Sequence, residues 1–233
     1  MKILLIHNYY RYRGGEDRYA DTLKTTFEAN GHTIIPFTFD STGIENQGSL
    51  HKLSIPFNFI HSKKIEAGLT ELVDREKPDI AILHNLFPLI GLTPLKILKE
   101  KNIPIVKRIE NYRFLCLNGL FLRRSPEGYR ICDVCKNGNL LPGIIHRCYQ
   151  DSYLNSLGMA LPLMLKNWKK LLLETVDCFL APSQFVRNTF IETGFPGDRI
   201  KVLPNFLDFQ PLDQPCESNG SAVFIGRLSA EKG

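Results

Sequence analysis

The chain has 233 residues, 43% of them hydrophobic and 23% charged, which is enough to bury a substantial core and is ordinary for a globular protein. Its 29 lysines and arginines against 24 acidic residues give a net charge of +5. This mild excess favours anionic partners but lacks the dense basic stripe of nucleic-acid-binding proteins. No window reaches the roughly 18 apolar residues of a membrane span, and the N-terminus lacks a signal-peptide pattern. We therefore expect a cytoplasmic protein that does not bind nucleic acid.

Apolar runs alternate with amphipathic stretches of helix length along most of the chain. The expected strands are Lys2–His7, Thr33–Thr38, Ile80–His84, Ile103–Ile109, Cys178–Ala181 and Lys201–Leu203. The expected helices are Glu16–Asn30, Ile65–Glu76, Pro94–Lys101 and one capped by Ser183 that ends before Gly194. Apolar strands separated by helices indicate a parallel sheet that is covered on both faces. The sequence therefore predicts an α/β fold with a doubly wound, Rossmann-like parallel sheet.

Two segments interrupt this alternation and define the expected domains. Residues 110–150 hold four of the six cysteines and many turn-forming residues, which indicates an irregular insertion. Residues 205–220 are rich in Pro, Asp, Asn and Gly and are typical of a linker. A single buried strand is expected next, at Ala222–Ile225, and one strand cannot bury its faces alone. We expect an N-terminal domain over residues 1–204 and, at 221–233, the start of a second domain that the chain cuts short.

A further stretch, Ser152–Glu174, is rich in leucine and carries Lys166, Lys169 and Lys170. This pattern favours core packing with a solvated lysine face. The alternative is a basic amphipathic helix that lies on a membrane surface.

The loop from His7 to Asp17 joins the first expected strand to the first helix. In open α/β sheets, ligands bind beyond the carboxyl ends of the strands. The pair Gly14-Gly15 would let the backbone approach a phosphate, next to the positive end of a helix. Neither a dinucleotide G-x-G-x-x-G motif nor a P-loop is present, which argues against nicotinamide and ATP-hydrolysing enzymes. A plain Gly-Gly turn is the competing interpretation.

This loop, with its pattern Tyr-x-x-x-Gly-Gly-Glu-Asp, resembles the opening of family 4 glycosyltransferases, bacterial enzymes with the two-domain GT-B architecture. Further similar motifs follow in the same order, so that the resemblance extends over essentially the whole chain. They lie at residues 84–88, 111–113, 116, 118–123, 146–149, 181–185, 204–208 and 226–233.

The resemblance implies transfer of a sugar from a nucleotide-sugar donor, a UDP- or GDP-sugar, to a saccharide or lipid-linked acceptor, with retention of configuration. It implies a role in cell-surface polysaccharide or glycolipid assembly, at the inner face of the membrane. By this resemblance, Gly14 and Gly15 approach the donor diphosphate. Arg227 and Lys232 then neutralise the charge that builds on the leaving nucleoside diphosphate. The acceptor would bind mainly to the N-terminal domain, so we expect no activity from this chain alone.

Two residues at strand ends are candidates for the catalytic site. His84 would face the cleft and hydrogen-bond sugar hydroxyls, or else simply cap its strand. Glu110 stands where relatives commonly have a histidine. An ionised glutamate accepts hydrogen bonds and would repel a diphosphate. The expected site therefore contains an unusual negative charge.

The cysteines of the insertion are spaced Cys116-x15-Cys132-x2-Cys135-x12-Cys148. This spacing suits a structural zinc ion held by four thiolates. A redox-active pair and plain buried thiols are the alternatives.

Two other functions compete with glycosyl transfer. A non-catalytic module on the same fold could bind a glycan or a protein. A zinc-dependent nucleic-acid binder would need a basic surface around the cysteines, where five cationic side chains are candidates. These are Arg123, Arg124, Arg130, Lys136 and Arg147.

Overall fold

The computed structural model describes residues 1–42, 49–165, 167–206, 220–226 and 228, without side-chain detail for 49–54. Six parallel strands form its central sheet in the order β2-β1-β3-β4-β7-β8. They are β1 (Lys2–Tyr9), β2 (Thr33–Asp40), β3 (Ile80–Leu83), β4 (Ile105–Arg108), β7 (Cys178–Ala181) and β8 (Ile200–Val202). All six strands expected from the sequence are present, and the doubly wound parallel sheet is confirmed.

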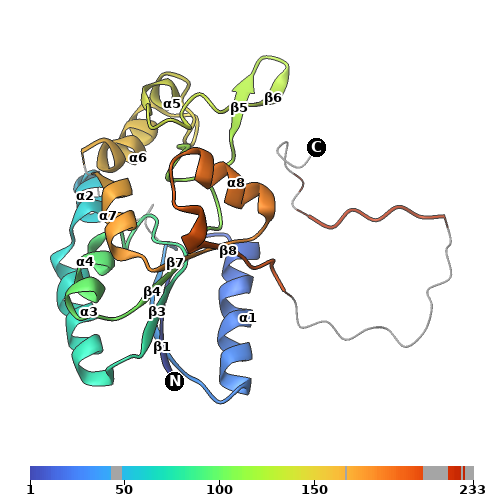
Figure 1. Ribbon diagram of the computed structural model, residues 1–233. Coiled ribbons are helices and arrows are strands. Elements are labelled where there is room, and N and C mark those ends of the chain that lie inside the picture. The colour runs from blue at the N-terminus through green and yellow to red at the C-terminus, as the bar shows by residue number, and fades with distance from the viewer. Residues whose placement is uncertain (43–48, 166, 207–219, 227, 229–233) are drawn as a thin grey trace.

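Helices cover both faces of the sheet, and Figure 1 shows α1 on one side of the strands with α3 and α4 on the other. The bounds of the main covering helices are α1 (Gly15–Ala29), α3 (Lys63–Glu76), α4 (Thr93–Glu100), α7 (Trp168–Thr175) and α8 (Gln184–Glu192). A short 3-10 helix, η2 (Gly197–Arg199), leads into β8.

Two cores follow from the alternation of side chains along β1. Leu4 and Ile6 belong to the larger cluster, which also holds buried residues of α3, α4, α7 and α8. Ile3 and Leu5 point the other way and pack with Leu23 of α1. A parallel strand that is covered on both faces needs apolar residues at every position, which is the pattern that the sequence shows here.

Four elements of the structure were not expected from the sequence. They are α2 (Ser49–Ile60), the antiparallel hairpin β5 (Leu122–Ser125) with β6 (Gly128–Ile131), and the short α5 (Leu141–Ile145). The hairpin and α5 both lie in the segment 110–150, which is otherwise irregular, and they stand above the sheet in Figure 1.

The leucine-rich stretch Ser152–Glu174 forms two helices, α6 (Tyr153–Leu165) and α7, where one was expected. Asn167 starts the second helix, since its side chain accepts a hydrogen bond from the backbone N–H of Lys170. Met159 and Leu163 of α6 are buried in the larger core. Core packing therefore accounts for part of this stretch, while other side chains of α6 remain exposed.

The buried strand expected at Ala222–Ile225 is wrong for this structure. Residues 222–225 have no strand assignment, and the side chains of Val223 and Ile225 are 80% and 93% exposed. An apolar run becomes a buried strand only where a neighbouring strand and a packed layer are available. Residues 207–219 of the expected linker lie outside the described residues.

Within the described part of the chain, every helix is too short or too polar to cross a membrane.

Candidate functional site

Buried polar side chains gather where β1, β3 and β4 reach their carboxyl ends. Six of them form what we call the strand-end cluster: His7, Asp17, His84, Lys107, Arg108 and Glu110. Buried charges and imidazoles are costly unless they are paired, so such a group at a sheet edge requires an explanation. This is also the edge where ligands bind in open α/β sheets.

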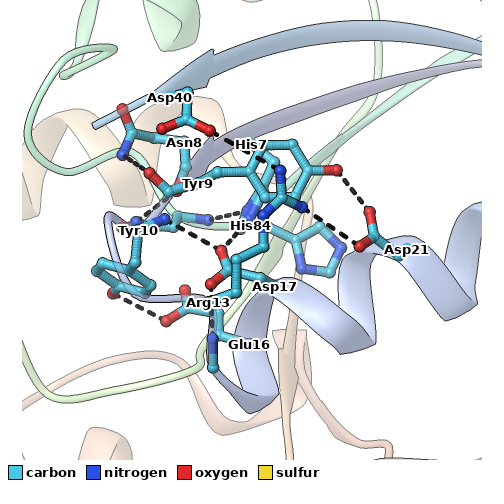
Figure 2. A network of polar contacts seen from close by, with 12 residues as sticks. His7, Asn8, Tyr9, Tyr10, Arg13, Glu16, Asp17, Asp21, Asp40 and His84 are labelled. Carbon is cyan, nitrogen blue, oxygen red and sulfur yellow. Dashed lines mark hydrogen bonds and ion pairs between the residues drawn. The ribbon is translucent and has the colours of Figure 1, made fainter. Parts of the chain in front are cut away.

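His7 and Asp17 connect the end of β1 to the start of α1 (Figure 2). The His7 Nε2 and Asp17 Oδ1 atoms are 2.9 Å apart, and both side chains are fully buried. Asp17 also accepts hydrogen bonds from the backbone N–H groups of Tyr10, at 3.2 Å, and of Gly14, at 2.9 Å. One carboxylate thus holds both ends of the glycine-containing loop.

The protonation of His7 follows from its neighbours. The backbone N–H of Asn85 donates to His7 Nδ1 at 3.4 Å, which leaves the ring proton on Nε2 to be donated to Asp17. Burial lowers the pKa of His7, although the hydrogen bond to Asp17 opposes this effect. His7 is therefore a neutral anchor for the loop near pH 7.

A second layer of contacts holds the loop from outside. The Tyr9 hydroxyl donates to Asp21 at 2.6 Å, and the Arg13 guanidinium lies 3.9 Å from the centre of the Tyr9 ring. Arg13 also bridges to Asp21 at 3.5 Å and to Asp40 at 3.8 Å. These contacts hold together β1 and α1, the two elements that flank Gly14 in the chain.

His84 and Glu110, the two expected catalytic residues, lie in direct contact. The His84 Nδ1 and Glu110 Oε1 atoms are 3.2 Å apart, and the Arg108 Nε–H donates to the same oxygen at 3.2 Å. The His84 side chain is fully buried, so in this conformation it reaches no solvent. Its Nε2 atom has no hydrogen-bond partner among the described residues.

Glu110 does not carry the uncompensated negative charge that the sequence indicated. Burial alone would raise its pKa, but the hydrogen bond to His84 and the positive charges of Arg108 and Lys107 together lower it. The cations directly precede Glu110 in the sequence, whereas His84 follows β3 and meets Glu110 only in the fold. The carboxylate is ionised and neutralised by its neighbours.

Arg108 and Lys107 are the cations of the cluster, and both are buried. Arg108 also donates to the backbone oxygen of Leu203 at 2.7 Å and to Asn205 Oδ1 at 2.5 Å. Lys107 donates to the backbone oxygens of His84 and Arg108, both at 2.5 Å. Burial lowers the pKa of Lys107 to about 8.

Glu16, in the first turn of α1, reaches the same region. Its Oε2 accepts hydrogen bonds from the Tyr10 hydroxyl at 2.9 Å and from Asn111 Nδ2 at 3.3 Å. Its Oε1 is buried without a partner among the described residues. Burial and the charge of Glu110 raise the pKa of Glu16 to about 7. This carboxyl group can therefore donate or accept a proton near neutral pH.

Arg113 completes the polar groups around Glu16. Its backbone N–H donates to Asn111 Oδ1 at 3.0 Å, and its guanidinium lies 5.8 Å from the centre of the Tyr10 ring. Its Nε atom is buried and has no partner among the residues that the structure describes. The site thus contains a buried donor on Arg113 and a buried acceptor on Glu16, neither of which has a partner within the described part of the chain.

A small pocket of about 20 Å³ lies at this edge of the sheet. Glu16, Glu110 and Asn111 line it on the polar side, and Phe114 and Phe190 are among its apolar wall residues. Small-molecule sites commonly combine an apolar wall with a few oriented polar groups. His84 supports this pocket through Glu110 but is not among its lining residues.

The backbone at Gly14 and Gly15 faces open space. A methyl group added at either position would meet no atom within 4 Å, and neither residue has a positive φ. The fold itself therefore does not require glycine here. A ligand that approaches the backbone closely is a physical reason for the pair.

The expected site residues are only partly brought together. His84, Glu110 and the Gly14-Gly15 loop lie at one edge of the sheet, whereas Arg227 and Lys232 lie outside the described residues. Sequence reasoning missed Lys107 and Arg108 as site residues. The signal was available, because two adjacent cations inside an apolar strand are unusual unless they are paired.

The four cysteines of the insertion lie elsewhere, around a second cavity below the β5–β6 hairpin. Cys116, Cys132, Cys135 and Cys148 all line it, and none of them forms a disulfide. Among the described residues, no three His, Cys, Asp or Glu side chains already stand in metal-binding geometry. The zinc hypothesis remains a prediction.

Comparison with known proteins supports the family resemblance. Residues 142–210, from α5 to beyond β8, match the family described as Glycosyltransferase Family 4. No curated protein matches the chain significantly. The resemblance to family 4 glycosyltransferases is thus confirmed by a model of that family over this part of the chain.

One of three similar solved structures, WaaB, supports the fold. The lipopolysaccharide outer core galactosyltransferase WaaB is 14% identical, with a TM-score of 0.50 over 95% of this chain and 50% of that one. HepE of Anabaena, in complex with UDP, is 16% identical with a TM-score of 0.43, over 89% of this chain and 45% of that one. The UDP-GlcNAc 2-epimerase of Neisseria meningitidis is 14% identical, also with a TM-score of 0.43, over 87% and 45%. The chain thus spans about half the length of these structures, and the likeness is one of fold.

Proposed function

We propose that the chain is the acceptor-side half of a glycosyltransferase that moves a sugar from a nucleotide-sugar to a saccharide or lipid-linked acceptor, with retention. The observation that carries this proposal is the match to family 4 glycosyltransferases, on a fold in which β3 and β4 end at one pocket that both polar and apolar side chains line. By the same resemblance, the enzyme serves cell-surface polysaccharide or glycolipid assembly in the cytoplasm.

The acceptor sugar would bind beside Glu16, Asn111 and Arg113. A sugar hydroxyl both donates and accepts a hydrogen bond, and the site offers the buried Glu16 Oε1 as acceptor and Arg113 Nε as donor. Asn111 holds both neighbours in place, through its contacts with Glu16 and with the Arg113 backbone. These three residues form our proposed acceptor subsite.

Glu110 would contact substrate, and His84 would position it. Both hydrogen bonds to Glu110, from His84 and Arg108, go to Oε1, so we assign Oε2 to a hydroxyl of the bound sugar. Because Arg108 and Lys107 neutralise the carboxylate, it repels a diphosphate less than an isolated glutamate would.

The donor diphosphate would approach Gly14 and Gly15 at the N-terminus of α1. The open space at both glycines and the partial positive charge of the helix end support this assignment. Arg227 and Lys232 would supply the fixed cations for the departing nucleoside diphosphate, which is UDP or GDP.

Product formation tests this proposal. The chain joined to a family 4 donor domain is incubated with UDP- and GDP-sugars and a panel of saccharide and lipid-linked acceptors. We expect glycosylated product, and Glu16→Gln should reduce kcat/KM by at least tenfold. A folded fusion that forms no product with any donor would contradict the proposal.

The chain by itself should bind nucleotide-sugars weakly, because most donor contacts would come from the second domain. Calorimetric titration should give no dissociation constant below about 10 µM, or roughly −7 kcal/mol. Tighter binding by the chain alone would show that the second domain is not needed for the donor.

A non-catalytic glycan-binding module is the second candidate. The internal pairing of His84, Arg108 and Glu110 favours it, since a site whose charges are already satisfied can hold a ligand without reacting. Glycan binding that is unchanged by nucleotide-sugars, together with absent transfer by the fusion, would identify this alternative.

We also propose that α5 and α6 contact an anionic membrane surface, where a lipid-linked acceptor would reside. These helices pack against each other and leave large apolar side chains exposed. The exposed residues are Leu141, Ile145, Leu154, Leu157, Met164 and Leu165. The net charge of +5 complements anionic lipid.

Vesicle sedimentation tests this contact. The chain should sediment with phosphatidylglycerol vesicles and less with phosphatidylcholine, and Leu154→Asp with Leu157→Asp should abolish the difference. Phe185→Asp, at an equally exposed position on α8, is the matched control and should bind as the wild type does. Equal binding by both variants would contradict the assigned surface.

A further inference from the structure

Four cysteines from three segments of the insertion converge on one cavity, which we call the thiol cavity. Cys116 follows the 112–115 turn, Cys132 and Cys135 follow the β5–β6 hairpin, and Cys148 follows α5. The convergence is a tertiary feature, since 32 positions separate the outermost pair along the chain. None of the four forms a disulfide.

The surroundings of the thiols suit a bound cation. The backbone of Gly143 hydrogen-bonds Cys135, a contact that favours a thiolate. Arg123 lines the same cavity, and its charge would offset part of the excess negative charge of four thiolates. The His146 Nε2 atom, 2.7 Å from an Arg123 nitrogen, is already occupied as its acceptor. The cysteines are therefore the available ligands.

The hairpin side of the cavity has little apolar burial to hold it in one conformation, whereas Leu117 and Leu140 on the other side are buried in the larger core. All four residues of β6 are exposed, α5 has only five residues, and the side chains of Ile131 and Val134 are 86% and 54% exposed. Ordering such a segment costs conformational entropy that hydrophobic burial here does little to offset. A metal bound only by the folded geometry would stabilise it directly.

We propose that Cys116, Cys132, Cys135 and Cys148 bind one structural zinc ion. Four protein ligands leave no open position for water, which assigns the ion to structure and not to catalysis. The described thiols do not yet stand in coordinating geometry, so binding requires rotation about the single side-chain torsion of each cysteine. Each bound thiolate releases one proton.

The ion would also act on the proposed acceptor subsite. The backbone N–H of Cys116 donates to the Tyr112 carbonyl at 2.7 Å, and Tyr112 N–H donates to the Gly119 carbonyl at 3.0 Å. Arg113 lies inside this turn, next to the Tyr10–Glu16 pair. Fixing Cys116 would therefore fix the position of Arg113. This consequence rests on the proposed function, whereas zinc binding itself does not.

Elemental analysis tests the proposal directly. The full chain, purified under reducing conditions without chelator, should contain about one zinc per chain. Cys132→Ser with Cys135→Ser should lose the metal, and Cys178→Ser, a cysteine outside the cavity, should retain it. Less than about 0.2 zinc per chain in fresh wild type, or equal zinc in the double variant, would overturn the proposal.

Cobalt substitution keeps the proposal testable if the double variant fails to fold. Wild type stripped with a chelator under reducing conditions should take up one Co²⁺, with thiolate charge-transfer bands and the intense visible bands of tetrahedral coordination. Zinc should displace the cobalt and raise the melting temperature. Octahedral cobalt spectra, or no uptake by protein shown to be folded, would overturn it.

Discussion

The strand-end cluster and the thiol cavity place reactive side chains together in different ways. The cluster stands on three adjacent strands, and its charges neutralise one another, as His84, Arg108 and Glu110 show. The thiol cavity is lined in part by the short β5–β6 hairpin, and its four thiols stand together without forming a disulfide. A parallel sheet can position buried charges through its backbone ladder alone, whereas an irregular segment needs a further crosslink.

Among the substitutions that compare the two regions, removal of Arg108 should cost the most stability. Arg108→Met removes the cation that is hydrogen-bonded to the buried Glu110, so we expect the free energy of unfolding to fall by about 3–5 kcal/mol. Urea unfolding measures the loss. Arg108→Met combined with Glu110→Gln should recover part of it, and a double variant that is no better than Arg108→Met would show that the ion pair is not the cause.

Gly119→Ala should have the next largest effect, because it strains the turn that links the two regions. Gly119 has a φ of +76°, and an added methyl group would lie 2.9 Å from Arg113 Cγ. We expect a loss of roughly 1–3 kcal/mol in thermal unfolding, with a weaker acceptor affinity of the fusion enzyme.

Gly14→Ala is the matched control for stability, since an alanine methyl group there would have no other atom within 4 Å. It should unfold like the wild type but weaken donor binding by the fusion enzyme. Equal destabilisation by both substitutions would contradict the distinction between a turn glycine and a ligand-facing glycine.

The pH dependence of stability should test the raised pKa of Glu16, which lies beside the strand-end cluster. Its pKa is raised from 4.5 to about 7, so the folded state takes up a proton between these values. The contribution of Glu16 to stability should therefore fall as pH rises from about 4.5 to 7. The lowered pKa values of the buried His7 and His84 act in the opposite direction, so the difference between Glu16→Gln and the wild type is the quantity to measure. Glu16→Gln cannot titrate, so its stability relative to the wild type should rise over this window.

Urea unfolding at several pH values below 8 makes this measurement. The upper limit avoids Lys107, whose pKa near 8 makes stability rise with pH above that value. Glu28→Gln, at an exposed position on the same helix, should follow the wild-type profile. A constant difference between Glu16→Gln and the wild type across the window would show that Glu16 titrates normally.

The smallest loss of stability is expected for a substitution on the surface of the cysteine-containing segment. Arg124 and Asp151 form an ion pair at 3.0 Å, but their side chains are 70% and 52% exposed. Solvent screens such a pair, so Arg124→Met should cost less than about 1 kcal/mol. A loss as large as that of Arg108→Met would show that this segment is held by surface charges instead of a metal.

The sequence anticipated the parts of the site that depend on local order. The strand end at His84, the Gly14-Gly15 loop and the start of α1 follow from apolar runs and turn residues that are read within a few positions. It did not predict the contacts that Glu110 makes, because His84 follows a different strand of the sheet. It also misjudged Ala222–Ile225, because a local apolar pattern says nothing about whether a partner strand is present.

The sequence by itself determined the order of strands and helices, and with it the parallel sheet and the edge at which a ligand would bind. Only the tertiary structure decided which polar groups meet there: Asp17 with His7, Asn111 with Glu16, and Arg108 with Asn205, 97 positions away. Hydrophobic periodicity is a property of residues that are neighbours along the chain, so it can be recognised in the sequence before the fold is known. The pairing of buried charges and thiols depends on distances that exist only after the chain has folded.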